Sequence, residues 1–524
     1  MLRAQSTTIG IIAFTLAAPG WAADKVHLTV DPSKSGAKID RNIFGQFAEH
    51  LGSGIYEGIW VGPKSPIPNT RGIRNDVVAA LRALKVPNVR WPGGCFADEY
   101  HWRKGIGPAD KRTATLNPNW GGVIEPNSFG TREFMDFLDQ IGSEAYLSVN
   151  VGSGTPQEAA EWLEYLTASQ PTALAKERAA NGHSAQYKIA FLGIGNESWD
   201  CGGNMSADYY LSQLKIYSRF VRNFNPSQQE KNQMLKIAVG PGDPGTEWTE
   251  TVMKAYQSRH WSWDINGLSL HSYTVGKWPP SYASVGFGTA EYAQLLKHTL
   301  AMEDLVTKQS AVMDKYDPDK KVALVVDEWG AWLAPMPGSN PGFLVQQNSL
   351  RDAVLASLNF NIFARHADRV RMANIAQMIN VLQAMILTNK EKMILTPTYH
   401  VFRMYVPFQD ATFVPVSFDA GTYKYGDVSL PRVDAIAAKD PAGKLWVEIT
   451  NVDPEQSAEI ELDVAGAKIK SAGGETLTAP KVDSVNSFEA PQTVVRKPIA
   501  AKVQNGRLAV LVEPKSVTVI SIEP

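Results

Sequence analysis

Short apolar runs alternate with amphipathic stretches from about residue 42 to residue 390, a pattern typical of a protein built from strand–helix units. The apolar runs are rich in β-branched residues, which favour strands. The predicted strands cover residues 43–47, 88–91, 145–151, 189–194, 235–239, 265–270, 322–326 and 370–375. The chain therefore repeats one kind of unit over most of its length.

The stretches between these strands have helical periodicity. Residues 75–85 place their apolar side chains on one face, which predicts an amphipathic helix. Thr155 precedes a proline and lies three residues before Glu158, so these residues predict a helix start with a capping box. Ser206 is expected to cap a further helix over residues 207–224.

Repeated strand–helix units of roughly forty residues fit an α/β fold of the (β/α)8 TIM barrel type in length and order. The main alternative is a doubly wound open sheet, which usually carries a glycine-rich phosphate loop after its first strand. No such loop is visible in the sequence. Gly193-Ile-Gly195 lacks the third glycine and follows the fourth strand, so we do not interpret it as a dinucleotide motif.

The pattern changes after about residue 395. Residues 445–450, 458–464 and 508–512 alternate with a period near two, which predicts an additional antiparallel β-sandwich domain. Residues 26–30 have the same pattern and are expected to add a strand to it. The predicted organisation is a signal peptide over 1–22, a catalytic barrel over 41–392, and a sandwich formed by 23–40 together with 393–524.

The N-terminal residues have the pattern of a signal peptide. Arg3 provides a positive start, an apolar stretch runs from Ile9 to Ala18, and Gly20 and Ala22 are the small residues expected before a cleavage site. The stretch is about half the length that a membrane span requires, and no later segment is long enough to cross a bilayer. We therefore predict a periplasmic or secreted protein, the alternative being an uncleaved, disordered start.

Composition narrows the classes of partner and cofactor. The formal net charge of −2 provides no electrostatic reason to expect nucleic acid or an anionic membrane as a partner. Trp (14) and Tyr (17) are plentiful, and they suit both core packing and stacking on sugars. The sequence has no HExxH motif, no histidine cluster with zinc spacing and no EF-hand loop, so we predict no required metal and no cofactor. It also lacks the Gly-x-Ser-x-Gly elbow of many esterases.

The two cysteines of the chain are Cys95 and Cys201. Two cysteines do not make a disulfide framework, and their spacing excludes a cysteine zinc site. The sequence leaves open whether they pair with each other.

Two glutamates follow buried strands at the end of the barrel where catalytic groups lie. Glu197 ends the fourth strand in Leu192-Gly-Ile-Gly-Asn-Glu-Ser-Trp, and Glu328 ends the seventh in Leu324-Val-Val-Asp-Glu-Trp-Gly. Glycosidic hydrolysis needs one carboxylic acid to protonate the leaving oxygen and a second carboxylate on the other face of the sugar. A single glutamate at a strand end is more often solvated or ion-paired, so it is the pair that indicates a glycosidase.

Several motifs, in order along the chain, make this interpretation more specific. They are Phe44-Gly-Gln-Phe-Ala-Glu-His-Leu, Ile55-Tyr-Glu-Gly-Ile-Trp-Val-Gly, Val89-Arg-Trp-Pro-Gly-Gly-Cys-Phe-Ala, Gly105-Ile-Gly-Pro, Gly193-Ile-Gly-Asn-Glu, Leu268-Ser-Leu-His-Ser-Tyr-Thr, Val326-Asp-Glu-Trp and Asn374-Ile-Ala-Gln-Met-Ile-Asn. With them the chain resembles glycoside hydrolase family 51, the α-L-arabinofuranosidases, across essentially the whole mature length. The resemblance implies a (β/α)8 barrel joined to a β-sandwich, and a retaining double displacement.

The resemblance also implies roles for individual residues. Glu197 is expected to be the acid/base and Glu328 the nucleophile. The expected supporting residues are Arg90 and Tyr273 beside the Glu328 carboxylate, Asn196 at the sugar 2-hydroxyl, Glu49 as a hydroxyl acceptor, and Cys95 and Gln377 at the furanose ring. Many relatives carry Asn where this chain has Cys95.

Each supporting residue also has a purely structural interpretation. Arg90 could close the barrel with a salt bridge, Tyr273 could pack in the core, and Glu49 could pair with its neighbour His50. A buried Cys95 could be only a small apolar residue. His271 is expected to orient carboxylates rather than to bind metal. Some of Trp60, Trp102, Trp199 and Trp329 are expected to form the rim of the site.

We therefore predict an exo-acting α-L-arabinofuranosidase that removes terminal arabinofuranosyl groups from arabinoxylan, arabinan or arabino-oligosaccharides. The alternatives are another retaining glycosidase on the same scaffold, such as a β-xylosidase or an endo-glucanase, and a non-catalytic carbohydrate-binding protein. Relatives are commonly oligomeric, so a homo-oligomer is among the expectations, but the sequence determines neither the oligomeric state nor the linkage preference.

Overall fold

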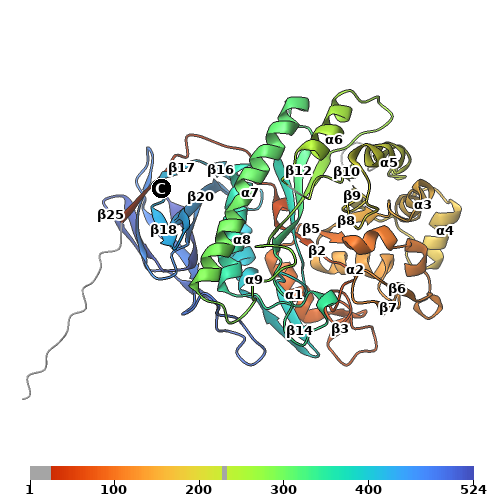
Figure 1. Ribbon diagram of the computed structural model, residues 1–524, viewed down its shortest axis with the longest axis horizontal. Helices are drawn as coiled ribbons and strands as arrows, with labels where there is room; N and C mark the ends of the chain where they lie inside the picture. Colours follow the sequence, from red (N-terminus) through yellow and green to blue (C-terminus); the bar gives the residue numbers. More distant parts are fainter. Residues whose placement is uncertain (1–24, 227–232, 243) are drawn as a thin grey trace, which may run out of the picture.

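The computed structural model describes residues 25–226, 233–242 and 244–524. A strand barrel ringed by helices lies on one side of the molecule, and a β-sandwich lies on the other (Figure 1). Helices α7 and α8 run between the two parts. The predicted signal peptide, residues 1–22, lies outside the described residues.

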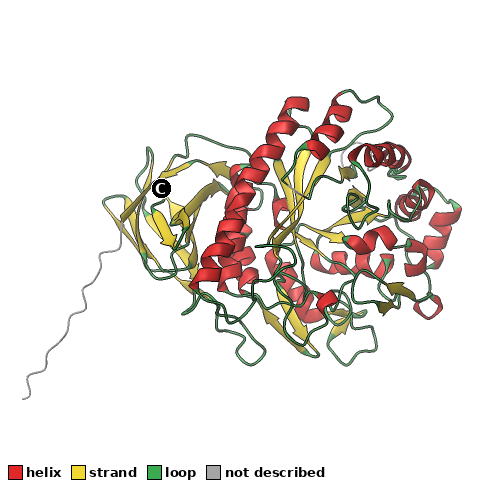
Figure 2. Ribbon diagram, in the orientation of Figure 1, coloured by secondary structure: helices red, strands yellow, loops and turns green. Residues whose placement is uncertain are grey.

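Eight parallel strands close into a barrel in their order along the chain. They are β2 (Gly45–Phe47), β5 (Asn88–Trp91), β8 (Glu144–Val149), β9 (Ile189–Ile194), β10 (Leu235–Ala238), β11 (Gly267–Thr274), β12 (Ala323–Ala331) and β13 (Val370–Ile375). The closed ring confirms the TIM barrel and excludes the open sheet. Figure 2 shows these strands surrounded by helices on their outer side.

Two differences from the predicted strands affect the site. The predicted strand 43–47 is wrong over its first two residues, because Arg41–Phe44 forms the 3-10 helix η1 and Asp40 caps it by accepting from the Asn42 backbone N–H at 2.9 Å. Strands β11 and β12 run farther than predicted, so His271 and Glu328 lie within strands, opposite each other. The register shifts between Ser269 and His271, and such a bulge re-aims side chains beside an active site.

The helices that cover the barrel follow the predicted periodicity. They are α1 (Asn75–Leu84), α2 (Thr131–Ile141), α3 (Pro156–Thr167), α4 (Ala173–Ala180), α5 (Ala207–Phe220), α6 (Glu247–Gln257), α7 (Thr289–Tyr316), α8 (Leu350–Arg365) and α9 (Pro397–Met404). The short 3-10 helices are η1, η2 (Cys95–Glu99), η3 (Trp102–Gly105), η4 (Ala109–Lys111), η6 (Pro341–Phe343) and η7 (Val406–Phe408). Helix α5 ends four residues earlier than predicted.

The predicted helix caps are present, but one capping box is incomplete. Thr155 accepts from the backbone N–H of Glu158 at 3.1 Å, and Ser206 accepts from that of Tyr209 at 3.3 Å. The carboxylate of Glu158 does not return to the cap and instead contacts His101 Nδ1 at 3.0 Å. The prediction of a reciprocal capping box at Thr155 is therefore wrong, because a tertiary partner takes the glutamate.

The C-terminal part forms two stacked, mainly antiparallel sheets, as predicted. One sheet has the order β17 (Val416–Phe418), β1 (Lys25–Val30), β22 (Ala458–Val464), β26 (Arg507–Val512), β25 (Ala501–Gln504). The other has the order β16 (Thr412–Val414), β20 (Val433–Lys439), β21 (Leu445–Asn451), β27 (Ser516–Glu523), β23 (Ser471–Leu477), β24 (Arg496–Pro498). The N-terminal strand β1 does join the sandwich, where it pairs parallel to β22.

Four small hairpins complete the described strands. They are β3 (Asn69–Thr70) with β4 (Ile73–Arg74), β6 (Thr115–Asn117) with β7 (Val123–Glu125), β14 (Ile386–Asn389) with β15 (Lys392–Leu395), and β18 (Thr422–Tyr425) with β19 (Val428–Pro431). Among the residues that the structure describes, no helix is both long enough and apolar enough to span a bilayer.

Helix α8 joins the barrel to the sandwich through a buried polar cluster. It contacts strands β20, β21 and β27 of the sandwich. Glu448 of β21 is fully buried and accepts from Ser357, Asn361 and Thr450 at 2.9, 2.7 and 2.6 Å. Burial raises the pKa of Glu448 to about 8. We propose that the domain boundary lies near residue 392, although α9, which follows it, still packs on α8 and α1.

Candidate active site

The carboxylate of Glu328 is held on both of its oxygens. Arg90, from β5, donates from Nη1 to Oε1 at 2.7 Å, and Tyr273, from β11, donates its hydroxyl to Oε2 at 2.5 Å. Arg90 is 1% exposed and packs over the ring of Phe47 with 4.6 Å to the centroid. Burial lowers the pKa of Arg90, but the charges of Asp327 and Glu328 together raise it by more, so the guanidinium stays charged. These contacts fix the direction in which Glu328 points.

Glu197 lies just after β9, where the chain turns into the site. Its backbone φ is +37°, two residues after Gly195 at +91°, so the glutamate itself is in the left-handed region that non-glycine residues rarely adopt. Its Oε1 lies 2.8 Å from His271 Nδ1, and the side chain is 15% exposed. Burial, and then the charge of Glu328, raises the pKa of Glu197. Burial and the neighbouring negative charge therefore favour the protonated form of the Glu197 carboxyl.

His271 lies between the two glutamates. Its Nδ1 is 3.4 Å from Glu328 Oε1 as well as near Glu197, and its Nε2 is 3.2 Å from Asp327 Oδ1. Burial lowers the pKa of His271, but Glu328 and Asp327 outweigh it and raise the pKa to about 10. Asp327 in turn accepts from the Tyr146 hydroxyl at 2.6 Å.

The two glutamates and His271 form one close cluster. One oxygen of Glu197, one oxygen of Glu328 and one ring nitrogen of His271 all lie within 4.8 Å of one another. An imidazolium has both nitrogens protonated and offers no lone pair to a cation. The cluster therefore fits a proton-sharing network better than a metal site.

Glu49 lies close enough to Glu328 to be affected by its charge. Its Oε1 accepts from the Phe96 backbone N–H at 3.0 Å and from Trp120 Nε1 at 2.8 Å, and its Oε2 accepts from Gln377 Nε2 at 2.9 Å. Burial, and then the charge of Glu328, raises the pKa of Glu49 to about 7. The Gln377 Oε1 atom is buried and has no hydrogen-bond partner among the described residues.

His50 does not pair with Glu49. Its Nδ1 lies 2.9 Å from Glu125 Oε2, and its Nε2 accepts from Trp91 Nε1 at 3.1 Å. The structural alternative for Glu49 is therefore wrong, because the neighbouring histidine points into the packing around β5.

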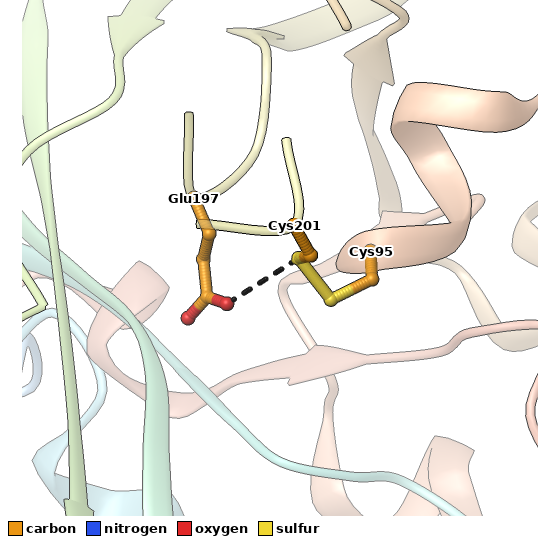
Figure 3. Close-up of side chains that lie close together, drawn as sticks. All are labelled: Cys95, Glu197 and Cys201. Atoms are coloured by element: carbon orange, nitrogen blue, oxygen red, sulfur yellow. Dashed lines mark hydrogen bonds between the residues drawn. A yellow bond between two sulfur atoms is a disulfide. The ribbon is translucent and has the colours of Figure 1, made fainter. Parts of the chain in front are cut away.

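The cysteines, whose pairing the sequence left open, form a disulfide. Their Cα atoms are 5.5 Å apart, and 106 residues separate them along the chain. Figure 3 shows the bridge beside the Glu197 carboxylate, whose Oε2 lies 3.6 Å from Cys201 Sγ.

Asn196, next to Glu197, accepts from Arg90 Nη2 at 2.5 Å. The structure thus brings every predicted site residue into one neighbourhood.

Two of the four tryptophans expected at the rim lie in the core instead. Both Trp102 and Trp329 are buried in the core, where Trp102 packs against Trp162 and Tyr165, and Trp329 packs against Phe360 and Phe363, so neither belongs to the rim. The aromatic side chains that extend outward from Tyr273 are Trp332, at a ring distance of 4.8 Å, and then Trp278, at 5.0 Å from Trp332 and 60% exposed.

Sequence reasoning missed Trp332, Trp278, Trp120, Asp327 and Asp98. Trp332 lies four residues after Glu328 and next to Thr274 of the adjoining strand, where Trp332 N–H bonds to the Thr274 carbonyl at 3.1 Å. Its position after a strand end was a usable signal. Trp120 had no such signal, because it reaches Glu49 from a loop remote in sequence.

Comparison with known proteins identifies the family. A family model described as "Alpha-L-arabinofuranosidase 1 domain" matches residues 80–257, and one described as "Alpha-L-arabinofuranosidase C-terminal domain" matches residues 327–516. The chain is 44% identical over 515 residues to "Intracellular exo-alpha-L-arabinofuranosidase" of Bacteroides ovatus, covering 98% of both chains.

That relative also corrects the predicted location. It is named an intracellular enzyme and matches this chain over 98% of its length, which contradicts the prediction of a periplasmic or secreted protein. The prediction depended on a short N-terminal pattern: one basic residue, an apolar stretch of moderate length and small residues before an expected cleavage site. Such stretches are ambiguous, because buried segments have them as well as signal peptides.

Solved structures agree with the family assignment. The crystal structure of the GH51 arabinofuranosidase from Xanthomonas axonopodis pv. citri superposes with a TM-score of 0.92 at 51% identity, covering 95% of this chain and 100% of that one. An arabinose complex of α-L-arabinofuranosidase from Thermotoga maritima superposes with a TM-score of 0.80 at 30% identity, with the same coverage. The chain therefore belongs to glycoside hydrolase family 51 and has α-L-arabinofuranosidase activity.

Proposed function

We propose that the enzyme is exo-acting and retaining, with Glu328 as the nucleophile and Glu197 as the acid/base. The observation that carries this proposal is the separation of the two glutamates, whose nearest oxygens lie within 4.8 Å of each other. Retaining glycosidases hold their carboxyl groups about 5–5.5 Å apart, whereas inverting enzymes need about 6.5–9.5 Å to fit a water molecule. The short separation supports direct attack on the sugar.

In the first step, Glu328 attacks the anomeric carbon while Glu197 protonates the leaving oxygen. Arg90 and Tyr273 each hold one oxygen of Glu328, so little reorientation precedes the attack. The raised pKa of Glu197 lets it keep a proton for the leaving group.

In the second step, water releases the sugar from Glu328. Glycosylation removes the negative charge of Glu328, and that charge is the second cause of the raised pKa of Glu197. The pKa of Glu197 therefore falls in the intermediate, and the ionised carboxylate accepts a proton from the attacking water. One residue thus serves as acid and then as base.

Polar groups beside Glu328 are proposed to bind the arabinofuranosyl ring. Glu49 and the unpartnered Oε1 of Gln377 are acceptors for sugar hydroxyls, and Asn196 lies beside the acid/base for the 2-hydroxyl. Cys95 is proposed to contact the ring through the disulfide.

The remainder of the substrate is proposed to lie along Tyr273, Trp332 and Trp278, which lead from Glu328 to the surface. Aromatic faces suit stacking on sugars, and the partner would be arabinoxylan, arabinan or their oligosaccharides. The word "exo" in the name of the Bacteroides ovatus relative supports removal of terminal groups. A homo-oligomer also stays a proposal, which light scattering on the purified enzyme tests.

Product stereochemistry tests the mechanism. Hydrolysis of nitrophenyl α-L-arabinofuranoside, followed by NMR, is expected to release the α-anomer first, and initial release of the β-anomer would exclude double displacement. Xylosides and cello-oligosaccharides serve as comparison substrates. Turnover of cello-oligosaccharides alone would exclude the exo assignment.

A further inference from the structure

Helix η2 is joined to the segment that carries Glu197 by two separate links. Cys95, its first residue, forms the disulfide to Cys201. Asp98, on the same helix, accepts from the backbone N–H of Asn196 through Oδ2 at 2.9 Å. The links lie on either side of Glu197, one residue before it and four residues after it.

Asp98 also ties this segment to the neighbouring barrel strand. Its Oδ1 accepts from the backbone N–H groups of Val151 and Gly152, just after β8, at 2.7 and 2.8 Å. One carboxylate therefore binds three amides from two strand ends. Asp98 is buried and both of its oxygens are taken by these backbone amides, so it acts through the backbone that it holds.

The chain packs too tightly here for a side chain at either of two glycines. A Cβ atom on Gly202 would lie 1.8 Å from the Asn196 carbonyl oxygen and 2.8 Å from Asp98 Oδ2. A Cβ atom on Gly152 would lie 2.9 Å from that of Asp98. Two glycines therefore let η2 and both strand ends meet around the Asp98 carboxylate.

Glu197 needs such support because its backbone is in the left-handed region at φ +37°. Residues other than glycine persist there only where the surrounding structure enforces the conformation. The disulfide contributes from the other side, since Cys201 Sγ lies 3.6 Å from Glu197 Oε2 (Figure 3). As part of a disulfide, this sulfur has no proton to donate and acts by contact alone.

We propose that Asp98 is a positioning residue of the reaction, which sets the acid/base carboxyl of Glu197 by holding the Asn196 amide against the disulfide-anchored helix η2. The proposal rests on the acid/base role proposed for Glu197. Asp98 holds the backbone next to the proton donor and makes no hydrogen bond to the nucleophile Glu328, so its loss should weaken most strongly the steps that need a proton.

Leaving-group dependence distinguishes this role from a general structural one. In Asp98→Asn the amide offers a single acceptor and cannot bind both strand ends. We expect kcat/KM for an alkyl arabinofuranoside, which needs protonation, to fall about 100-fold, within the range that a general acid contributes. For dinitrophenyl arabinofuranoside, which leaves unprotonated, we expect a fall of less than about 10-fold. Azide should raise the kcat of Asp98→Asn for the dinitrophenyl substrate, because azide attacks the glycosylated enzyme without needing a general base.

The matched control is Glu99→Gln on the same helix. Glu99 is exposed, and its one hydrogen bond among the described residues is accepted from Asn119 Nδ2 at 3.3 Å, so both rates should stay unchanged. Asp98→Asn is chosen over Asp98→Ala because it keeps the side-chain volume. Thermal unfolding checks that the Asp98→Asn variant is folded. Equal losses on both substrates, or no loss on either, would overturn the positioning role.

A parallel Glu197→Ala variant separates the two proposals. It should show the same selective loss, larger in size, with rescue by azide. A normal Glu197→Ala result beside an unselective Asp98→Asn overturns only the role of Asp98. A Glu197→Ala variant without leaving-group selectivity overturns the acid/base assignment and the role of Asp98 together.

Discussion

His271 Nδ1 lies 2.8 Å from Oε1 of Glu197, while the other ring nitrogen faces Asp327 at 3.2 Å. The imidazole is therefore fixed at both ends between carboxyl groups. The positive charge and the hydrogen bond of His271 lower the pKa of Glu197, against the larger effects of burial and of Glu328, which raise it. His271 thus moderates how firmly the acid holds its proton.

Substitution of His271 should change the pH dependence of the reaction. In His271→Asn the cation is absent, so the pKa of Glu197 rises and the basic limb of the kcat/KM profile moves to higher pH. We expect the rate at the optimum to fall by less than the factor of about 10²–10⁴ that a general acid contributes. The measurement is a pH profile with a substrate whose leaving group needs protonation. A basic limb that moves to lower pH would contradict this assignment.

Removal of the nucleophile should abolish turnover without unfolding the protein. Glu328→Ala is expected to lower kcat by on the order of 10⁴-fold or more, because the covalent step has no other attacking group. Steady-state kinetics and a thermal melt measure the two effects. The exposed Glu391→Ala variant is the control and should keep full activity. Near-normal turnover by Glu328→Ala would remove this residue from the mechanism.

Glu448 should make the stability of the enzyme depend on pH. Its pKa is raised to about 8 in the folded protein, whereas an exposed glutamate has a pKa of about 4.3 when unfolded. Between these two pKa values the Glu448 carboxyl is ionised in the unfolded protein and protonated in the folded one. The contribution of Glu448 to stability is therefore largest below about pH 4.3 and falls as the pH rises to about 8. The loss should be on the order of a few kcal/mol.

Glu448→Gln tests this dependence, because an amide can donate to Ser357 and Thr450 and accept from Asn361. The variant should lose less stability than the wild type between pH 5 and pH 8 in urea unfolding. Glu489→Gln, at an exposed position, is the control and should follow the wild type. Parallel pH curves for Glu448→Gln and the wild type would show that the Glu448 carboxyl does not titrate in this range.

The disulfide should stabilise the barrel by restricting its unfolded chain. It closes a loop over a sequence separation of 106 residues, and a disulfide typically stabilises a fold by about 2–4 kcal/mol. The Cys95→Ser, Cys201→Ser double variant is expected to unfold at correspondingly lower urea concentration. Adding a reductant should destabilise the wild type and leave the double variant unchanged. Equal stability of the wild type with and without the reductant would contradict a stabilising bridge.

Local pattern alone determined the kinds of element and the bounds of three barrel strands. Residues 88–91, 189–194 and 370–375 were predicted as strands with the bounds that the structure has. Of these, 189–194 is the continuous apolar run that a buried parallel strand favours. The two glutamates were also predictable as candidates, since each lies at the carboxyl end of an apolar run, Glu197 after Leu192-Gly-Ile and Glu328 after Leu324-Val-Val. Resemblance to a family supplied the roles of residues that pattern could not distinguish from structural ones.

Tertiary structure decided which of these residues meet. Barrel closure brings β2, β5, β9, β11, β12 and β13 to one rim, and only there do Glu197, His271 and Glu328 lie within 4.8 Å. It also decided that the cysteines pair, that Trp329 is buried, and that Asp98 binds amides from two strand ends. Period and composition describe each segment by itself, whereas these contacts join residues remote along the chain and depend on how the ring closes.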